Sequence, residues 1–160
     1  MDPFAQTARG AATLLDLFAR TMVFTAAFVC VLSHGVMAGS LQISKAWTPE
    51  AKVGGDAPLL MTIANQGSEA DSLLRARCPV ANFLEKHTVD RGEGAPAMRA
   101  ISSIPVPPNQ TITLTLDSYH IMLLQLRQSL SVGQHFVCSV VFAKAGVLDV
   151  GVEVAPGEPH

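Results

Sequence analysis

Short runs in which apolar and polar residues alternate fill the chain after residue 40. The runs recur roughly every eight to twelve residues, with clusters of Gly, Pro, Asn or Asp between them, which is the spacing of an all-β sandwich. Residues 111–116 and 148–154 alternate with a period of two, so each predicts a strand with one buried face. Residues 105–109 are predicted as a connector because their prolines cannot donate to a strand ladder. The pattern predicts strands at residues 41–47, 59–65, 72–76, 81–89, 97–101, 111–116, 120–126, 136–142 and 147–154.

The first residues have a different pattern, that of a secretory leader. A start with Arg9 and Arg20 precedes an apolar stretch at residues 21–32, which is shorter than the ~20 residues that a membrane-spanning helix needs. Small residues follow, and Ala38 fits the position before a cleavage site. We therefore predict a signal peptide at residues 1–38.

Two alternatives to a cleaved leader stay open. The segment is long and contains Asp2 and Asp16, so it could remain as an uncleaved amino-terminal anchor. A lipid anchor on Cys30 is less favoured, because the bulky residues before it stand where such sites usually have small ones. Each interpretation puts the rest of the chain outside the cytoplasm.

The remaining chain is predicted to form one domain at residues 39–155, followed by a disordered tail at residues 156–160. Removing 38 of the 160 residues leaves 122, which is the size of a single domain. The leader contains two basic and two acidic residues, so the net charge of −2 stays with the domain. Such a charge excludes a nucleic-acid partner.

Two cysteines, Cys78 and Cys138, remain after the leader is removed. Export to an oxidising compartment favours a disulfide between them, which would close a long loop. Two buried thiols acting as small apolar side chains are the alternative.

Four residues suggest chemistry: His87, Met98, His120 and Met122. Ten residues separate the first pair, twenty-one the second and one the third. Imidazole and thioether donors without carboxylates favour soft Cu(I). His120 and Met122 lie two apart on one predicted strand, so they share a face about 7 Å apart, whereas the approach of the other two depends on tertiary structure.

Each of these residues taken singly has an ordinary explanation. A methionine in a sandwich is usually core, as we expect for Met61, and His87 could be an exposed histidine. The complete spacing changes this, since its chance occurrence in such a chain is on the order of 10⁻⁴. His135 follows a turn at Gly133 and is not expected to bind metal. Trp47 and Tyr119 are expected to be core residues.

These residues resemble the periplasmic copper chaperones of the PCu(A)C type. The resemblance covers nearly the whole domain and includes the metal spacing, Ala46-Trp47, Met61-Thr62-Ile63-Ala64-Asn65-Gln66-Gly67, Asp71, Leu73, Tyr119-His120-Ile121-Met122-Leu123, Leu126, Leu130 and Gly133. It implies a cupredoxin-like Greek-key β-sandwich that binds one Cu(I) through His87, Met98, His120 and Met122. It also implies a periplasmic carrier that delivers copper to an acceptor, such as a cytochrome oxidase subunit or another copper carrier. We expect a monomer, since weak or absent self-association suits a protein that must present an exposed ion.

Two features differ from the family pattern. Many members have a further methionine shortly after the first histidine, whereas Thr88 and Val89 stand here. Some relatives have a tail rich in His and Met that helps to bind Cu(II), whereas this tail has only His160. The four-residue donor set does not depend on either feature.

The chemistry indicates a carrier rather than an enzyme. No carboxylate is expected beside these ligands, and no nucleophile with a base is visible in the sequence. We expect nanomolar or tighter Cu(I) binding and much weaker Cu(II) or zinc binding. Two other classes remain. One is an electron-transfer cupredoxin, which needs a Cys near both a His and a Met, a combination that Cys138 lacks. The other is a structural or adhesive sandwich without metal.

Overall fold

The computed structural model describes residues 37–92 and 95–156, and within them it is built only of strands and their connections, without a helix. The predicted signal peptide lies almost entirely outside the described residues. The strands are β1 (Met37–Ala38), β2 (Leu41–Thr48), β3 (Ala57–Asn65), β4 (Asp71–Arg77), β5 (Ala81–Asp90), β6 (Ala97–Ile101), β7 (Ile104–Val106), β8 (Gln110–Thr113), β9 (His120–Leu126), β10 (His135–Phe142) and β11 (Gly146–Val154). The prediction of an all-β fold is confirmed.

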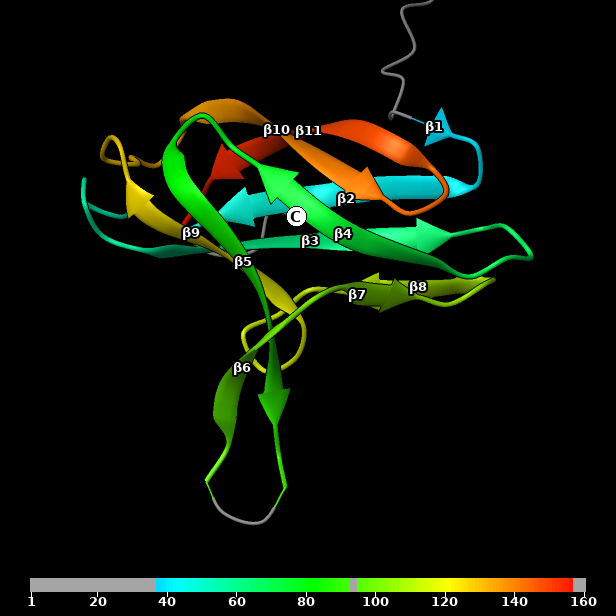
Figure 1. Cartoon of the computed structure of the whole chain (residues 1–160). Coiled ribbons are helices and arrows are strands. Elements are labelled where there is room, and N and C mark those ends of the chain that lie inside the picture. Colours follow the sequence, from blue (N-terminus) through cyan, green and yellow to red (C-terminus); the bar gives the residue numbers. More distant parts are fainter. Residues whose placement is uncertain (1–36, 93–94, 157–160) are drawn as a thin grey trace, which may run out of the picture. The chain divides into compact units, whose positions relative to one another are not determined.

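The strands pair in the order β6-β5-β9-β3-β2-β11-β10-β4-β7, with β1 added to β2 and β8 to β3. Most neighbours are not consecutive in sequence, and β2 and β11 pair in parallel while the other pairs are antiparallel. Strand β3 joins the two halves of this sheet: its start pairs with β9, and its end pairs with β8. The β5–β6 hairpin projects away from the other strands (Figure 1).

The core is apolar and comes from the inward positions of alternating strands. In β9, for example, Ile121 and Leu123 are fully buried, and in β11 every second residue from Leu148 to Val154 is buried. Met61 lies in this core, as expected. Trp47 does not: it is half-buried and lies opposite Leu60.

Two strands were not expected from the sequence: β1, at the end of the predicted signal peptide, and β7. Residues Ile104–Val106 form β7, which pairs with the start of β4, although Pro105 predicted a connector here. β7 ends the sheet order, and a proline is tolerated on an edge strand when its missing N–H group faces away from the ladder. The predicted strand at residues 111–116 is also shorter, because β8 ends at Thr113.

Two polar side chains fix the loops at the end of β3 and the start of β4. The Nδ2 group of Asn65 donates to the carbonyls of Glu69 (2.8 Å) and Val106 (3.3 Å), while its Oδ1 accepts from the amide of Gly67 (3.0 Å). Asn65 is buried, so these bonds satisfy a side chain that would otherwise oppose folding.

Asp71, at the start of β4, holds the turn between β10 and β11 through hydrogen bonds to backbone amides. Its Oδ1 accepts from the amides of Ser72 (2.7 Å) and Lys144 (3.0 Å), and its Oδ2 accepts from the amide of Ala145 (2.9 Å). Burial alone would raise the pKa of Asp71, but the hydrogen bonds from these backbone amides outweigh it and lower the pKa below its ordinary value of 3.8.

A disulfide joins Cys78, just after β4, to Cys138 on β10, across a sequence separation of 60 residues. Both residues are buried. The disulfide alternative of the sequence analysis is therefore the one that the structure contains.

We expect reduction of this disulfide to destabilise the domain by about 4 kcal/mol, because the unfolded chain loses a constraint on a long loop. Urea unfolding with and without a thiol reductant measures this difference. The Cys78→Ser/Cys138→Ser variant is the control, since its unfolding midpoint must not respond to the reductant. Equal midpoints for the oxidised and reduced wild type would contradict the expectation.

Asp71→Asn is expected to cost about 1–3 kcal/mol at neutral pH, because an amide group would face backbone donors with one acceptor too few. The folded-state pKa is lowered, so the contribution of the carboxylate is complete above the unfolded pKa and is lost as the pH falls through the folded value. Urea unfolding at about pH 7 and about pH 3 should therefore show a smaller difference between wild type and variant in acid. A difference that grows in acid would contradict this assignment.

Candidate metal centre

The pairing of β5 with β9 sets His87 directly opposite His120. Residues opposite each other on neighbouring strands project from the same face of a sheet. The two rings meet edge to face, with their centroids 5.5 Å apart and their planes at 87°. The sequence separates these residues, and the register of one strand pair brings them into contact.

His120 is fully buried, with 0% of its surface exposed. Its Nδ1 lies 3.1 Å from the carbonyl oxygen of Ser118. A carbonyl only accepts, so Nδ1 bears the proton and the lone pair of the neutral ring is on Nε2. That Nε2 is buried and has no hydrogen-bond partner.

His87 has the opposite tautomer. Its Nε2 lies 3.1 Å from Oε2 of Glu85, and a carboxylate oxygen can only accept. The lone pair is therefore on Nδ1, which is also buried without a partner, although 15% of the side chain is exposed. The expectation that no carboxylate accompanies the predicted ligands is wrong, because residues two apart on a strand share a face and Glu85 reaches the ring.

Burial of these two nitrogens without hydrogen-bond partners lowers the stability of the folded protein. A buried polar atom without a partner costs about 1–3 kcal/mol, and here two such atoms lie on adjacent strands. A cation that accepts both lone pairs removes this cost.

Met122 brings a sulfur to the same face. It lies two residues after His120 on β9 and opposite Glu85 on β5, and its side chain is half-buried. His120 and Met122 therefore lie on the same face of the sheet, as their spacing predicted.

Met98 approaches from the third strand, β6. There Ala100 lies opposite His87 and Met98 lies opposite Val89, so Met98 is the diagonal neighbour of His87 on the same face. Its side chain is 61% exposed. The topology thus places all four predicted residues on one face of β6, β5 and β9, with a gradient from a buried histidine to an exposed methionine.

Glu85 and Ser118 are the residues that the sequence analysis missed. Each stands two positions before a histidine, so strand alternation gave a signal for Glu85. Ser118 accepts the hydrogen bond through its backbone carbonyl, so the identity of its side chain gives no signal in the sequence. In the part of the chain that the structure describes, no group of three or more His, Cys, Asp or Glu side chains could hold a metal.

Two other expectations concern nearby residues. Tyr119 is half-buried and packs against the core, as expected from its position beside His120. His135 lies exposed at the start of β10, opposite Glu153, and is not part of the histidine pair.

Residues 41–154 match the model of the LpqE-like family, described as putative lipoprotein LpqE-like. The chain belongs to this family. A relative, a putative lipoprotein of Leifsonia xyli subsp. xyli (strain CTCB07), is 31% identical over 121 residues, which are 75% of this chain and 72% of the relative.

Solved structures of PCuAC domains share the fold of this LpqE-like protein. The apo PCuAC domain from PmoF1 is 24% identical with a TM-score of 0.65, and covers 79% of this chain and 100% of its own. The copper-bound PCuAC domain from PmoF2 is 21% identical with a TM-score of 0.66, over 78% and 99%. The solution structure of CuI-DR1885 from Deinococcus radiodurans is 23% identical with a TM-score of 0.59, over 78% and 86%. The fold that the resemblance implied is confirmed.

Among the residues that the structure describes, no helix has the length and apolar character needed to cross a membrane.

The tautomers give a prediction for the metal-free protein. At about pH 8, where imidazole is ordinarily neutral, His87 should bear its proton on Nε2 and His120 on Nδ1. Two-bond ¹H–¹⁵N correlation spectra distinguish these forms. Glu85→Leu should release the preference of His87 because the acceptor is lost, whereas Glu85→Gln should keep it through the amide oxygen. A His87 ring that is unaffected by Glu85→Leu would contradict the hydrogen bond.

Proposed function

We propose that this LpqE-like protein is an exported carrier of Cu(I) whose ligands are His87, Met98, His120 and Met122. The observation that supports this most strongly is the pair of buried imidazole nitrogens, each with its lone pair unpartnered and each with its other nitrogen held by an acceptor. Hydrogen bonds to the non-ligating nitrogen are the usual support of a metal-binding histidine.

The donor types favour the monovalent ion. Two neutral imidazoles and two thioethers add no charge, and sulfur ligands prefer soft Cu(I) to Cu(II) or zinc. Glu85 accepts a hydrogen bond from Nε2 of His87, so it orients the ring without occupying a coordination position.

The gradient in exposure suits transfer rather than storage. Met98 is the most exposed donor and comes from a projecting hairpin, whereas His120 is fully buried. An incoming ligand of an acceptor can displace the exposed thioether first, while the histidines still hold the ion. Exchange through such mixed intermediates keeps Cu(I) bound throughout.

Several wider features belong to the same proposal. The domain spans residues 39–155 after a signal peptide at residues 1–38, acts as a periplasmic monomer without enzymatic activity, and delivers copper for the assembly of cytochrome oxidase copper centres. The lipoprotein descriptions of the family and of its relative support export. The copper-bound PCuAC domain and CuI-DR1885 support copper as the cargo.

One alternative is weakened by the disulfide. An electron-transfer cupredoxin needs a cysteine thiolate beside its histidines. Cys78 and Cys138 are bonded to each other, so neither offers a thiolate. A structural or adhesive sandwich remains as the alternative and predicts a stability that does not depend on copper.

Titration with Cu(I) under reducing conditions, against a chelator of known affinity, tests the proposal. Free Cu(I) at about 100 times its Kd should stabilise the wild type by about 2.7 kcal/mol. Met122→Leu removes the sulfur and nearly conserves the volume, and it should weaken binding by about tenfold or more with little change in the stability of the metal-free protein.

Met61→Leu is the matched control, because this methionine lies in the hydrophobic core and is not one of the proposed ligands. His135→Ala controls in the same way for an exposed histidine. Equal binding by Met122→Leu and Met61→Leu would overturn the ligand assignment. Equal retention of zinc and Cu(I) in the presence of the chelator would overturn the choice of metal.

A further inference from the structure

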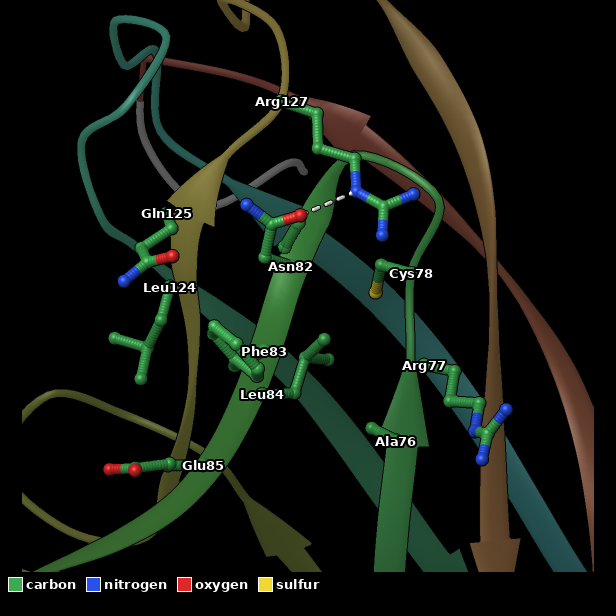
Figure 2. Close-up of a pocket in the computed structure, with 11 residues that line it drawn as sticks. Ala76, Arg77, Cys78, Asn82, Phe83, Leu84, Glu85, Leu124, Gln125 and Arg127 are labelled. Carbon is green, nitrogen blue, oxygen red and sulfur yellow. Dashed lines mark hydrogen bonds between the residues drawn. The ribbon is translucent and has the colours of Figure 1, made fainter.

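A cavity of about 700 Å³ opens between the end of β4 and the start of β5. Figure 2 shows Ala76, Arg77 and Cys78 along one side, and residues from Asn82 to Glu85 along the other. We call this cavity the β4–β5 cleft. It adjoins the candidate metal centre, because Glu85 lines the cleft and also bonds to His87.

Among the residues that the structure describes, neither strand that borders the cleft has a strand partner on the side that faces it. β7 pairs with β4 only at Asp71–Leu73, and β6 pairs with β5 only from Lys86 onward. Along the cleft, β4 therefore pairs only with β10, and β5 pairs only with β9. Unpaired strand edges of this kind are templates for the addition of another strand.

The ladder shows which backbone groups of β5 face the cleft. Pro58 on β3 lies opposite Met122 and has no N–H group, so the hydrogen bonds between β3 and β9 belong to the neighbouring pairs at Ile121 and Leu123. Met122 and its alternate neighbours then bond to β5 at Phe83, Glu85 and His87. The amide and carbonyl of Leu84 therefore point away from β9, toward the cleft.

The side chains around this edge are apolar near the sheet and basic at the rim. Phe83 is 59% exposed, and Leu124 lies half-exposed opposite it on β9. Arg77 and Arg127 line the cleft, both exposed, and the Nε of Arg127 donates to Asn82 (2.8 Å; Figure 2).

One further cation, Lys86, does not line the cleft but links the two strands that border it. The Nζ of Lys86 donates to the carbonyl of Leu74 (2.6 Å), which ties β5 to β4 at the inner end. Burial, and after it the positive charge of Arg75, lower the pKa of Lys86. Among the residues that line the cleft, Glu85 is the one acidic side chain, and it is already bonded to His87.

We propose that the β4–β5 cleft is a docking site for an extended, acidic segment of a partner protein, which adds as a strand to the free edge of β5 at Leu84. The backbone of the segment bonds to Leu84, its apolar side chains cover Phe83 and Leu124, and its carboxylates face Arg77 and Arg127. A partner held there lies beside the strand that contains Glu85 and His87. Copper is not needed for this docking, so it stands or fails separately from the proposed function.

The test uses the metal-free protein and a blocked peptide of alternating valine and aspartate about eight residues long, enough to span a typical strand. Addition of the peptide should shift the amide resonance of Leu84 and slow its hydrogen exchange, with smaller changes far from the cleft. Two control peptides have the same length: one has lysine in place of aspartate, and one has methylated backbone nitrogens. Both should bind much more weakly.

Arg77→Gln should weaken binding of the aspartate peptide by about two- to fivefold, with a loss that shrinks as salt is added. Lys144→Gln removes the same charge at the β10–β11 turn and is the matched control. The proposal is overturned if the Leu84 amide does not respond to millimolar peptide. It is also overturned if the methylated or lysine peptide binds as well as the aspartate peptide, or if Arg77→Gln and Lys144→Gln bind it equally.

Discussion

The register between β5 and β9 is the constraint on which the candidate metal centre depends. A strand alternates its side chains with a period of two, so a slip of one residue would turn His120 from the face of His87 into the core, where Ile121 and Leu123 now pack. The burial of the apolar face of β9 therefore determines which side chains stand on its polar face. Because β9 is buried on its inner side, the free energy of core packing holds the two imidazoles opposite each other, and no contact between the rings is needed to bring them there.

The same arrangement explains why the site can be unfavourable for the metal-free protein and still persist. Two unpartnered imidazole nitrogens oppose folding, whereas the disulfide, Asn65 and Asp71 stabilise parts of the sheet away from them. The unpartnered nitrogens destabilise the fold at the site, and interactions elsewhere in the sheet offset this free energy. A cation that binds the nitrogens recovers that cost as affinity, which is the energetic advantage of a preorganised site.

The sequence predicted most of the fold because period-two alternation is a strong signal wherever one face of a strand is buried. It failed at β7, where Pro105 argued against a strand, since a sequence does not tell whether a strand will stand at an edge. For the candidate site it named His87, Met98, His120 and Met122 by their spacing. It could not give the hydrogen bonds that set the tautomers, because the carbonyl of Ser118 acts irrespective of its side chain and alternation puts Glu85 on the face of His87 without fixing their contact. The diagonal position of Met98 also follows from the β5–β6 register, which spacing alone does not fix.

Strand β5 contributes to the candidate metal centre, to the core and to the proposed docking edge. Its outer face presents Glu85 and His87, its inner face packs Leu84 against the core, and its edge is covered by β6 along only part of its length. A long open edge would invite aggregation, and here the rim of arginines and the bond from Lys86 to β4 restrict what can approach. Movement of this edge would shift the hydrogen-bond acceptor of His87, since both lie on the same short stretch of chain. A segment bound at the proposed docking site would therefore lie beside Glu85, which links that site to the orientation of His87.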